Sequence, residues 1–212
     1  MTFFVRLELR AVAALVAALA ALIVPPAAAA ERHYVVGRFL VPRVPPATRH
    51  RTDRTGNLLY NGNFETGHIN HGWYQCGDMP AFITTAHPFS GRYAEYSGIV
   101  SAGAEPRGNS GVCQRITIPV GGMLTAELFQ LSDETSSEYA YQEADLLDNH
   151  GNVVVNLYKT VNNRAAWTPA RWNLTAYAGR TYWLYFGVHG DGYNGLSTQQ
   201  FVDEVRLTPS HE

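Results

Sequence analysis

Hydrophobic and polar residues alternate with a period of two in several short segments of the chain. The clearest are TYWLYFGV at 181–188, MLTAELFQL at 123–131 and YAYQEADLLD at 139–148. This period is typical of β-strands, because successive side chains point to opposite faces of a sheet. Turn signals rich in Gly, Pro and Asn separate such segments roughly every 8 to 12 residues, and helical periodicity is nearly absent. The sequence therefore predicts an all-β fold, a β-sandwich of two antiparallel sheets over residues 57–208.

A further alternating segment near the end of the chain, FVDEVRL at 201–207, carries an acid in its hydrophobic pattern. Strict alternation places Asp203 on the inward face together with Phe201, Val205 and Leu207. Burying an unpaired carboxylate is costly, so this interpretation requires a cation or several hydrogen-bond donors beside Asp203.

Other segments predict particular local structures. NLLYNGNFETG at 57–67 is interpreted as a first edge strand between two turns, and 139–160 as a hairpin closed by the turn DNHG. A short helical turn is expected at 175–178. Trp73 and Trp167 are expected in the core, whereas Trp172 is ambiguous.

Composition divides the chain into four parts. Residues 1–30 carry two early arginines, then an apolar run and then an alanine-rich stretch typical of a cleavage site. This order indicates a secretory signal peptide rather than a membrane anchor. Residues 31–56 hold six arginines against two acids and several prolines, which is typical of a basic linker or tail. The sandwich at 57–208 is acidic, which argues against nucleic acid as a partner, and 209–212 form a C-terminal tail.

Export bears on the two cysteines of the chain, Cys76 and Cys113. Outside the cytoplasm they are free to oxidise, so we expect one disulfide between them, with two buried free thiols as the alternative. The predicted location is secreted or extracellular, with no transmembrane segment after cleavage of the signal peptide.

The outward-facing residues of the three alternating strands suggest a binding surface. If the strands share one sheet, aromatic rings gather there beside carboxylates, at Glu127, Phe129, Tyr139, Tyr141, Glu143, Trp183, Tyr185 and the neighbouring His189. Rings that cover the C–H face of a sugar, next to acids that accept its hydroxyl hydrogens, predict carbohydrate binding. The alternative is that the N-terminal arm, a loop or a partner sheet covers this face and makes the rings ordinary core.

The order of several motifs resembles one family. NGNFETG, HPFSGRYAEY, CQRITIPVGGMLT, ADLLDNHGNVV and FVDEVRL follow one another as in galactose-binding-like jelly-roll modules, especially secreted bacterial carbohydrate-binding modules of the cellulose- and xylan-binding type. The resemblance covers 57–208. It implies a structural calcium ion held by Glu65, Asp203 and carbonyls around Ser90 and Gly91, with Glu204 as the second acid. The alternative is that Asp203 bonds to an arginine or to backbone amides.

These observations together predict a secreted, non-catalytic protein that binds a polysaccharide or other glycan through its aromatic sheet face. An extracellular protein-interaction or surface-associated module is the alternative. A small glycoside hydrolase or lyase is a weaker hypothesis, because acids that alternate along a strand, such as Glu143 and Asp145, usually form a solvated face.

Overall fold

The computed structural model describes residues 39–42, 56–98, 107–193 and 196–209, all within the compact unit Arg32–Glu212. The predicted signal peptide, most of the predicted linker and most of the C-terminal tail lie outside these residues. Where the chain is described, it contains no helix with the length and apolar character needed to cross a membrane.

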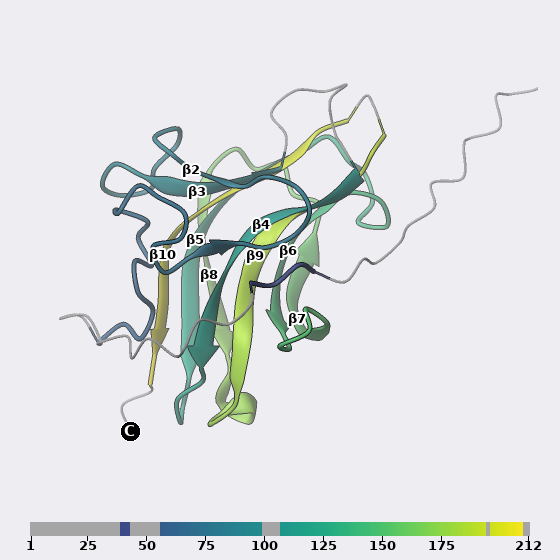
Figure 1. Ribbon diagram of the computed structural model, residues 1–212. Coiled ribbons are helices and arrows are strands. Elements are labelled where there is room, and N and C mark those ends of the chain that lie inside the picture. Colours follow the sequence, from purple (N-terminus) through teal and green to yellow (C-terminus); the bar gives the residue numbers. More distant parts are fainter. Residues whose placement is uncertain (1–38, 43–55, 99–106, 194–195, 210–212) are drawn as a thin grey trace, which may run out of the picture. The chain divides into compact units, whose positions relative to one another are not determined.

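Two antiparallel sheets of five strands each form a β-sandwich (Figure 1), which confirms the predicted fold class. Sheet A has the order β1-β4-β9-β6-β7, with β1 (Tyr74–Gln75), β4 (Arg107–Thr117), β9 (Thr181–Asp191), β6 (Tyr141–Leu147) and β7 (Val153–Thr160). Sheet B has the order β2-β3-β10-β5-β8, with β2 (Phe82–Thr84), β3 (Ala94–Gly98), β10 (Thr198–Thr208), β5 (Met123–Ser132) and β8 (Trp167–Asn173).

The hydrophobic core lies between the sheets and uses the inward half of each alternating strand. Leu184 and Phe186 of β9 enter it, together with Leu124 and Leu128 of β5 and Leu146 of β6. These are the faces that the alternation predicted. Burying one such side chain stabilises the fold by about 1.5–3 kcal/mol, so the pattern decides which face of each strand turns inward.

The predicted hairpin and the predicted helical turn are both confirmed. Strands β6 and β7 pair directly, and Asp148 organises their turn by accepting hydrogen bonds from the N–H groups of His150 (2.8 Å) and Asn152 (2.9 Å). Gly151 has a φ of 75°, in the left-handed region that residues with a side chain rarely adopt. The helical turn is the 3-10 element η1 (Thr175–Tyr177).

The predicted edge strand at 57–67 is wrong. Asn61 and Phe64 adopt positive φ angles of 52° and 57°, so the chain turns instead of extending. Its start is attached to β10 through one amide side chain and through the backbone. Asn57 Oδ1 accepts from the N–H of Leu207 and Asn57 Nδ2 donates to the carbonyl of Val205, both at 2.9 Å. The N–H of Leu58 donates to the carbonyl of Leu207 at 2.9 Å, so the turning segment keeps only isolated backbone bonds to β10 in place of a paired strand.

The expected disulfide between Cys76 and Cys113 is confirmed. Their Cα atoms lie 5.7 Å apart, and both residues are fully buried against the outer face of sheet A. The bond ties the segment after β1 to the middle of β4. It closes a loop of 37 residues.

We predict that replacing both cysteines by serine lowers the free energy of unfolding by about 3–4 kcal/mol, because the unfolded chain regains the entropy of that loop. Urea unfolding of the oxidised protein and of the Cys76→Ser/Cys113→Ser variant measures the difference. Reduction of the wild-type protein is the matched control and should reproduce the loss. Equal midpoints for the oxidised protein and the variant would contradict the prediction.

Candidate functional site

The outer face of sheet B presents its side chains in three cross-strand rows that differ in chemistry. The register of β10, β5 and β8 sets them side by side, because residues opposite each other in antiparallel strands share a face. The aromatic row is Phe201, Phe129 and Trp167; the acidic row is Asp203, Glu127 and Pro169; the basic row is Arg206, Thr125 and Arg171.

A β-bulge in β10 creates this order. The register against β5 shifts between Asp203 and Arg206, and Glu204 has a φ of 48°. The extra residue reverses the alternation, so that Val205 enters the core and Arg206 turns to the outer face. The predicted inward position of Phe201 and Asp203 is therefore wrong, although the inward positions of Val205 and Leu207 are confirmed.

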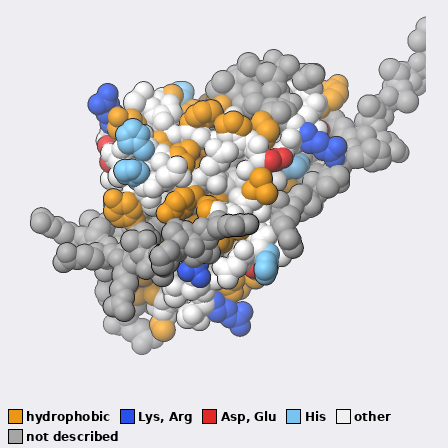
Figure 2. Space-filling model, viewed as in Figure 1, with side chains coloured by type: hydrophobic (Ala, Val, Ile, Leu, Met, Phe, Trp, Pro, Cys, Tyr) orange, Lys and Arg blue, Asp and Glu red, His pale blue; other side chains and the backbone are white. Residues whose placement is uncertain are grey.

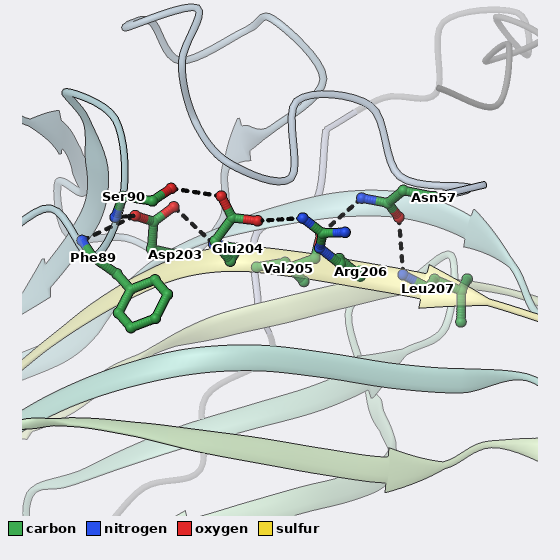
Figure 3. Close-up of polar contacts among 8 residues, drawn as sticks. All are labelled: Asn57, Phe89, Ser90, Asp203, Glu204, Val205, Arg206 and Leu207. Atoms are coloured by element: carbon green, nitrogen blue, oxygen red, sulfur yellow. Dashed lines mark hydrogen bonds and ion pairs between the residues drawn. The ribbon is translucent and has the colours of Figure 1, made fainter. Parts of the chain in front are cut away.

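Asp203 holds the loop that borders this face (Figure 3). Its Oδ2 accepts the N–H groups of Phe89 and Ser90, each at 3.0 Å, and its Oδ1 accepts the N–H of Glu204 at 2.7 Å. The hydroxyl of Ser90 donates to Glu204 Oε1 at 2.6 Å, while Arg206 donates to Glu204 Oε2 at 2.8 Å. Loop and bulge are thus joined in one network.

The acids of this network differ in their electrostatics. Burial raises the pKa of Asp203 to about 6, although the N–H of Ser90 favours its charged form. Burial and the nearby Glu204 raise the pKa of Glu127 above its usual value. Burial also acts on Glu204, but the hydrogen bonds from Ser90 and Arg206 outweigh it and lower the pKa of Glu204.

Aromatic rings continue from the aromatic row onto the loop. His87 stacks on Phe129 with 4.9 Å between centroids, and Phe89 meets Trp167 edge to face at 5.6 Å. Phe129 and Phe201 are buried beneath these contacts, whereas the Phe89 side chain is 47% exposed. Phe89 and the half-buried Trp167 are therefore the rings at the rim.

An open groove of about 720 Å³ runs beside these rings. Its lining joins the loop to the acidic and basic rows: Phe89, Ser90, Thr125, Ala126, Glu127, Pro169, Ala170, Arg171, Glu204 and Arg206. This size suits a small ligand or a few units of a polymer.

The predicted binding residues do not share one sheet. Glu127 and Phe129 belong to β5 in sheet B, but Tyr141, Glu143, Trp183 and Tyr185 belong to β6 and β9 in sheet A. Tyr139 lies in the turn before β6, and His189 faces Tyr141 across β6 and β9. The assumption that the three strands lie together was wrong, so the predicted cluster divides between two faces.

The outer face of sheet A is closed at its two central rings. Trp183 is 1% exposed and Tyr185 is fully buried. The ring of Phe39 packs on Tyr185 with 4.5 Å between centroids, and the hydroxyl of Tyr185 donates to the carbonyl of Ser110 at 3.1 Å. The prediction that both rings are exposed is wrong. A residue that the sequence placed in the linker covers them, as the alternative proposed.

Glu143 and Asp145 also lie on this face of sheet A, and they are buried rather than solvated. Asp145 Oδ1 accepts a hydrogen bond from Asn156 Nδ2 at 2.7 Å, and Glu143 lies opposite Lys159 in the register. Burial raises the pKa of both carboxyls, and for Glu143 repulsion from Asp145 adds to it. The interpretation of these acids as a solvated face was wrong.

The predicted calcium ligands lie near one another but serve the backbone. Glu65 Oε1 accepts the N–H groups of Arg92 (2.8 Å) and Tyr93 (2.9 Å), and Gly91 packs directly against this carboxylate. Ser90 offers Asp203 its N–H, not its carbonyl. Among the described residues, no group of three or more His, Cys, Asp or Glu side chains is arranged to hold a metal. This arrangement does not fit the predicted ligand set, and calcium stays a prediction.

No family model and no curated relative matches the sequence. Solved structures resemble this chain distantly and at low identity. TmCBM61 in complex with β-1,4-galactotriose is 20% identical with a TM-score of 0.49, over 73% of this chain and 99% of that one. The K1 cleaved adhesin domain of Lys-gingipain from Porphyromonas gingivalis W83 is 16% identical with a TM-score of 0.47, over 68% and 94%.

A family 16 carbohydrate-binding module is 14% identical with a TM-score of 0.43, over 72% of this chain and 99% of that one. Other matches are parts of enzymes, such as the glycoside hydrolase domain of Endo-D from Streptococcus pneumoniae R6. The chain is thus distantly similar in fold to carbohydrate-binding modules and gingipain adhesin domains.

The sequence pattern does not predict the groove residues Phe89, Arg171 and Arg206 as a binding site. Trp167, predicted in the core, lies half-buried on the outer face of sheet B beside the groove. A signal was present in WTPARWN at 167–173, where Trp167, Pro169 and Arg171 alternate with residues that face the core side. The loop residue Phe89 gave no periodic signal, because its position depends on a contact with β10.

We predict that Asp203→Ala destabilises the domain by about 1–3 kcal/mol, because the partly buried N–H groups of Phe89 and Ser90 lose their acceptor. Urea unfolding measures the change. Glu127→Ala is the matched control, an acid of the same groove, and should shift stability by no more than about 0.5 kcal/mol. Equal effects of the two variants would contradict the role of Asp203, and a wild-type midpoint that falls on adding chelator would support calcium.

The buried acid pair of sheet A generates a pH prediction. Folding raises the pKa of Glu143 and of Asp145. Above about pH 4 the folded state therefore binds more protons than the unfolded state. The free energy of unfolding consequently falls as pH rises through the raised pKa values. Glu143→Gln stays neutral at every pH. We expect it to exceed the wild type by about 1–3 kcal/mol at pH 8 and to match it near pH 4.

Unfolding in urea across this pH range measures the slope. Glu138→Gln is the control, since Glu138 is an exposed acid in the turn before β6. Identical pH slopes for Glu143→Gln and the wild type would refute the assignment of the slope to Glu143.

Proposed function

We propose that this protein binds a carbohydrate in the groove of sheet B. The observation that supports this most strongly is the meeting of an exposed ring, Phe89, with carboxylates and guanidinium groups in one open groove. A sugar has both apolar C–H faces and many hydroxyl groups. Binding it therefore requires flat apolar surface and hydrogen-bonding groups within the same few ångströms.

Each part of the groove meets one of these needs. Phe89 in the groove lining, and the half-buried Trp167 that it contacts beside the groove, offer ring surface for a sugar face. Glu127 accepts hydrogen bonds from hydroxyl groups, whereas Arg171 and Thr125 donate them. The groove is fixed in shape, because Asp203 anchors the loop that carries Phe89. A preformed site loses little conformational entropy on binding.

The exposed hydrophobic surface favours a sugar over a protein partner. Large exposed hydrophobic side chains are scattered over the described part of the chain, for example Tyr60, Val120 and Val154. Figure 2 shows hydrophobic side chains in several small patches on the visible face, separated by polar atoms. A protein interface would require a broader continuous surface.

We also propose that the groove is not catalytic. Hydrolysis of a glycosidic bond requires two carboxyl groups, one of which acts as base or nucleophile. Glu204 has the lowered pKa that suits that role, but Ser90 and Arg206 already engage both of its oxygens. The disulfide supports an extracellular location, where polysaccharides are found.

The experiment is affinity gel electrophoresis against a panel of soluble polysaccharides. We expect at least one polymer to retard the wild-type protein, and Phe89→Ala to weaken that binding about tenfold while leaving the unfolding midpoint nearly unchanged. Tyr193→Ala is the matched control, an aromatic side chain of similar exposure (46%) outside the groove. Undiminished binding by Phe89→Ala would refute this site, and lack of retardation by every polymer would refute the function.

A further inference from the structure

The basic row places two arginines on either side of one hydroxyl. Arg206 and Arg171 both lie directly opposite Thr125, and all three line the groove. Neighbouring strands are about 4.8 Å apart, so the Cα atoms of the two arginines are separated by about 10 Å across Thr125. Two guanidinium groups and a hydroxyl thus face the same space.

The donors of this row are largely available. Arg206 gives one N–H to Glu204 at 2.8 Å. In the described part of the chain, no ion pair or hydrogen bond engages the side chain of Arg171, which is exposed. A guanidinium group carries five N–H donors, so most of the donors in this row remain for a ligand.

The basic row depends on the bulge. In an unbroken strand, Arg206 would be in phase with Val202 and face the core. The extra residue at Asp203–Glu204 turns it outward, and the ion pair with Glu204 fixes its direction. A backbone irregularity that delivers one cation to a groove is typical of bulges near binding sites.

The neighbouring acidic row determines where an anion would lie. Glu127 and Glu204 stand between the aromatic and basic rows, and repulsion from Glu204 contributes to the raised pKa of Glu127. An anionic group is repelled there and attracted over Thr125. The aromatic and basic rows are four residues apart along β5, about 13 Å, so a polymer that lies along this face meets the exposed ring of Phe89 at one end and cations at the other.

We infer that the carbohydrate bound in this groove is acidic, with the carboxylate of a uronic-acid unit over Thr125 between Arg171 and Arg206. This inference rests on the proposed function. Guanidinium groups suit a carboxylate because their parallel N–H donors match its two oxygens. The hydroxyl of Thr125 supplies a further donor.

The test compares polygalacturonate with the same polymer after methyl esterification, which removes the charge and keeps the sugar. We expect the wild-type protein to bind the charged polymer at least tenfold more tightly by calorimetry, with a difference that shrinks as salt is added. Arg171→Gln should remove most of this preference. Arg180→Gln is the matched control, because Arg180 is exposed and lies outside the groove lining.

The outcomes separate the two proposals. Equal binding of both polymers, unchanged in Arg171→Gln, overturns the acidic ligand and leaves carbohydrate binding standing. Binding of neither polymer, together with binding of a neutral polysaccharide from the panel, also overturns it alone. Failure of every polysaccharide overturns both proposals. A sulfated polysaccharide that binds more tightly than polygalacturonate, and depends on Arg171, supports the anion site and identifies sulfate as its source.

Discussion

The extra residue in β10 is the constraint on which the organisation of sheet B depends. A buried carboxylate stabilises it: Asp203 accepts three backbone N–H groups, two from the loop at 89–90 and one from Glu204. These bonds satisfy an acid that would otherwise be costly to bury. They also connect an internal irregularity of one strand to the wall of a groove. Local backbone geometry and the shape of the surface are thus set by the same side chain.

The two outer faces of the sandwich differ because different elements cover them. Phe39 and the Cys76–Cys113 bridge pack on the rings of sheet A, so their aromatic surface contributes to stability. The loop at 87–90 covers Phe129, Phe201 and Asp203 of sheet B, and Glu127 and the basic row stay open beside it. The central rings are therefore covered on both faces, but on sheet B the covering loop itself presents an exposed ring, Phe89, beside an open groove.

Much of the fold could be predicted from alternation alone. The local pattern predicts the inward faces of β5, β6 and β9 and the β6–β7 hairpin. The predicted export of the chain accounts for the expectation that the two cysteines form a disulfide. Alternation could not show that β5 belongs to a different sheet from β6 and β9, because strand order depends on long-range pairing. It also could not show the bulge. Strict alternation places Phe201 and Asp203 on the same face as Val205 and Leu207, whereas the added residue puts the two pairs on opposite faces.

The way in which Asp203 holds the loop has a consequence for how this surface could change. The carboxylate binds the main-chain N–H groups of residues 89 and 90, and every amino acid except proline carries such a group. The ring of Phe89 is therefore not needed for the position of the loop. Substitutions at residue 89 would alter what the rim offers to a ligand while the scaffold beneath it persists, so this position is a natural starting point for evolving or engineering new ligand preferences.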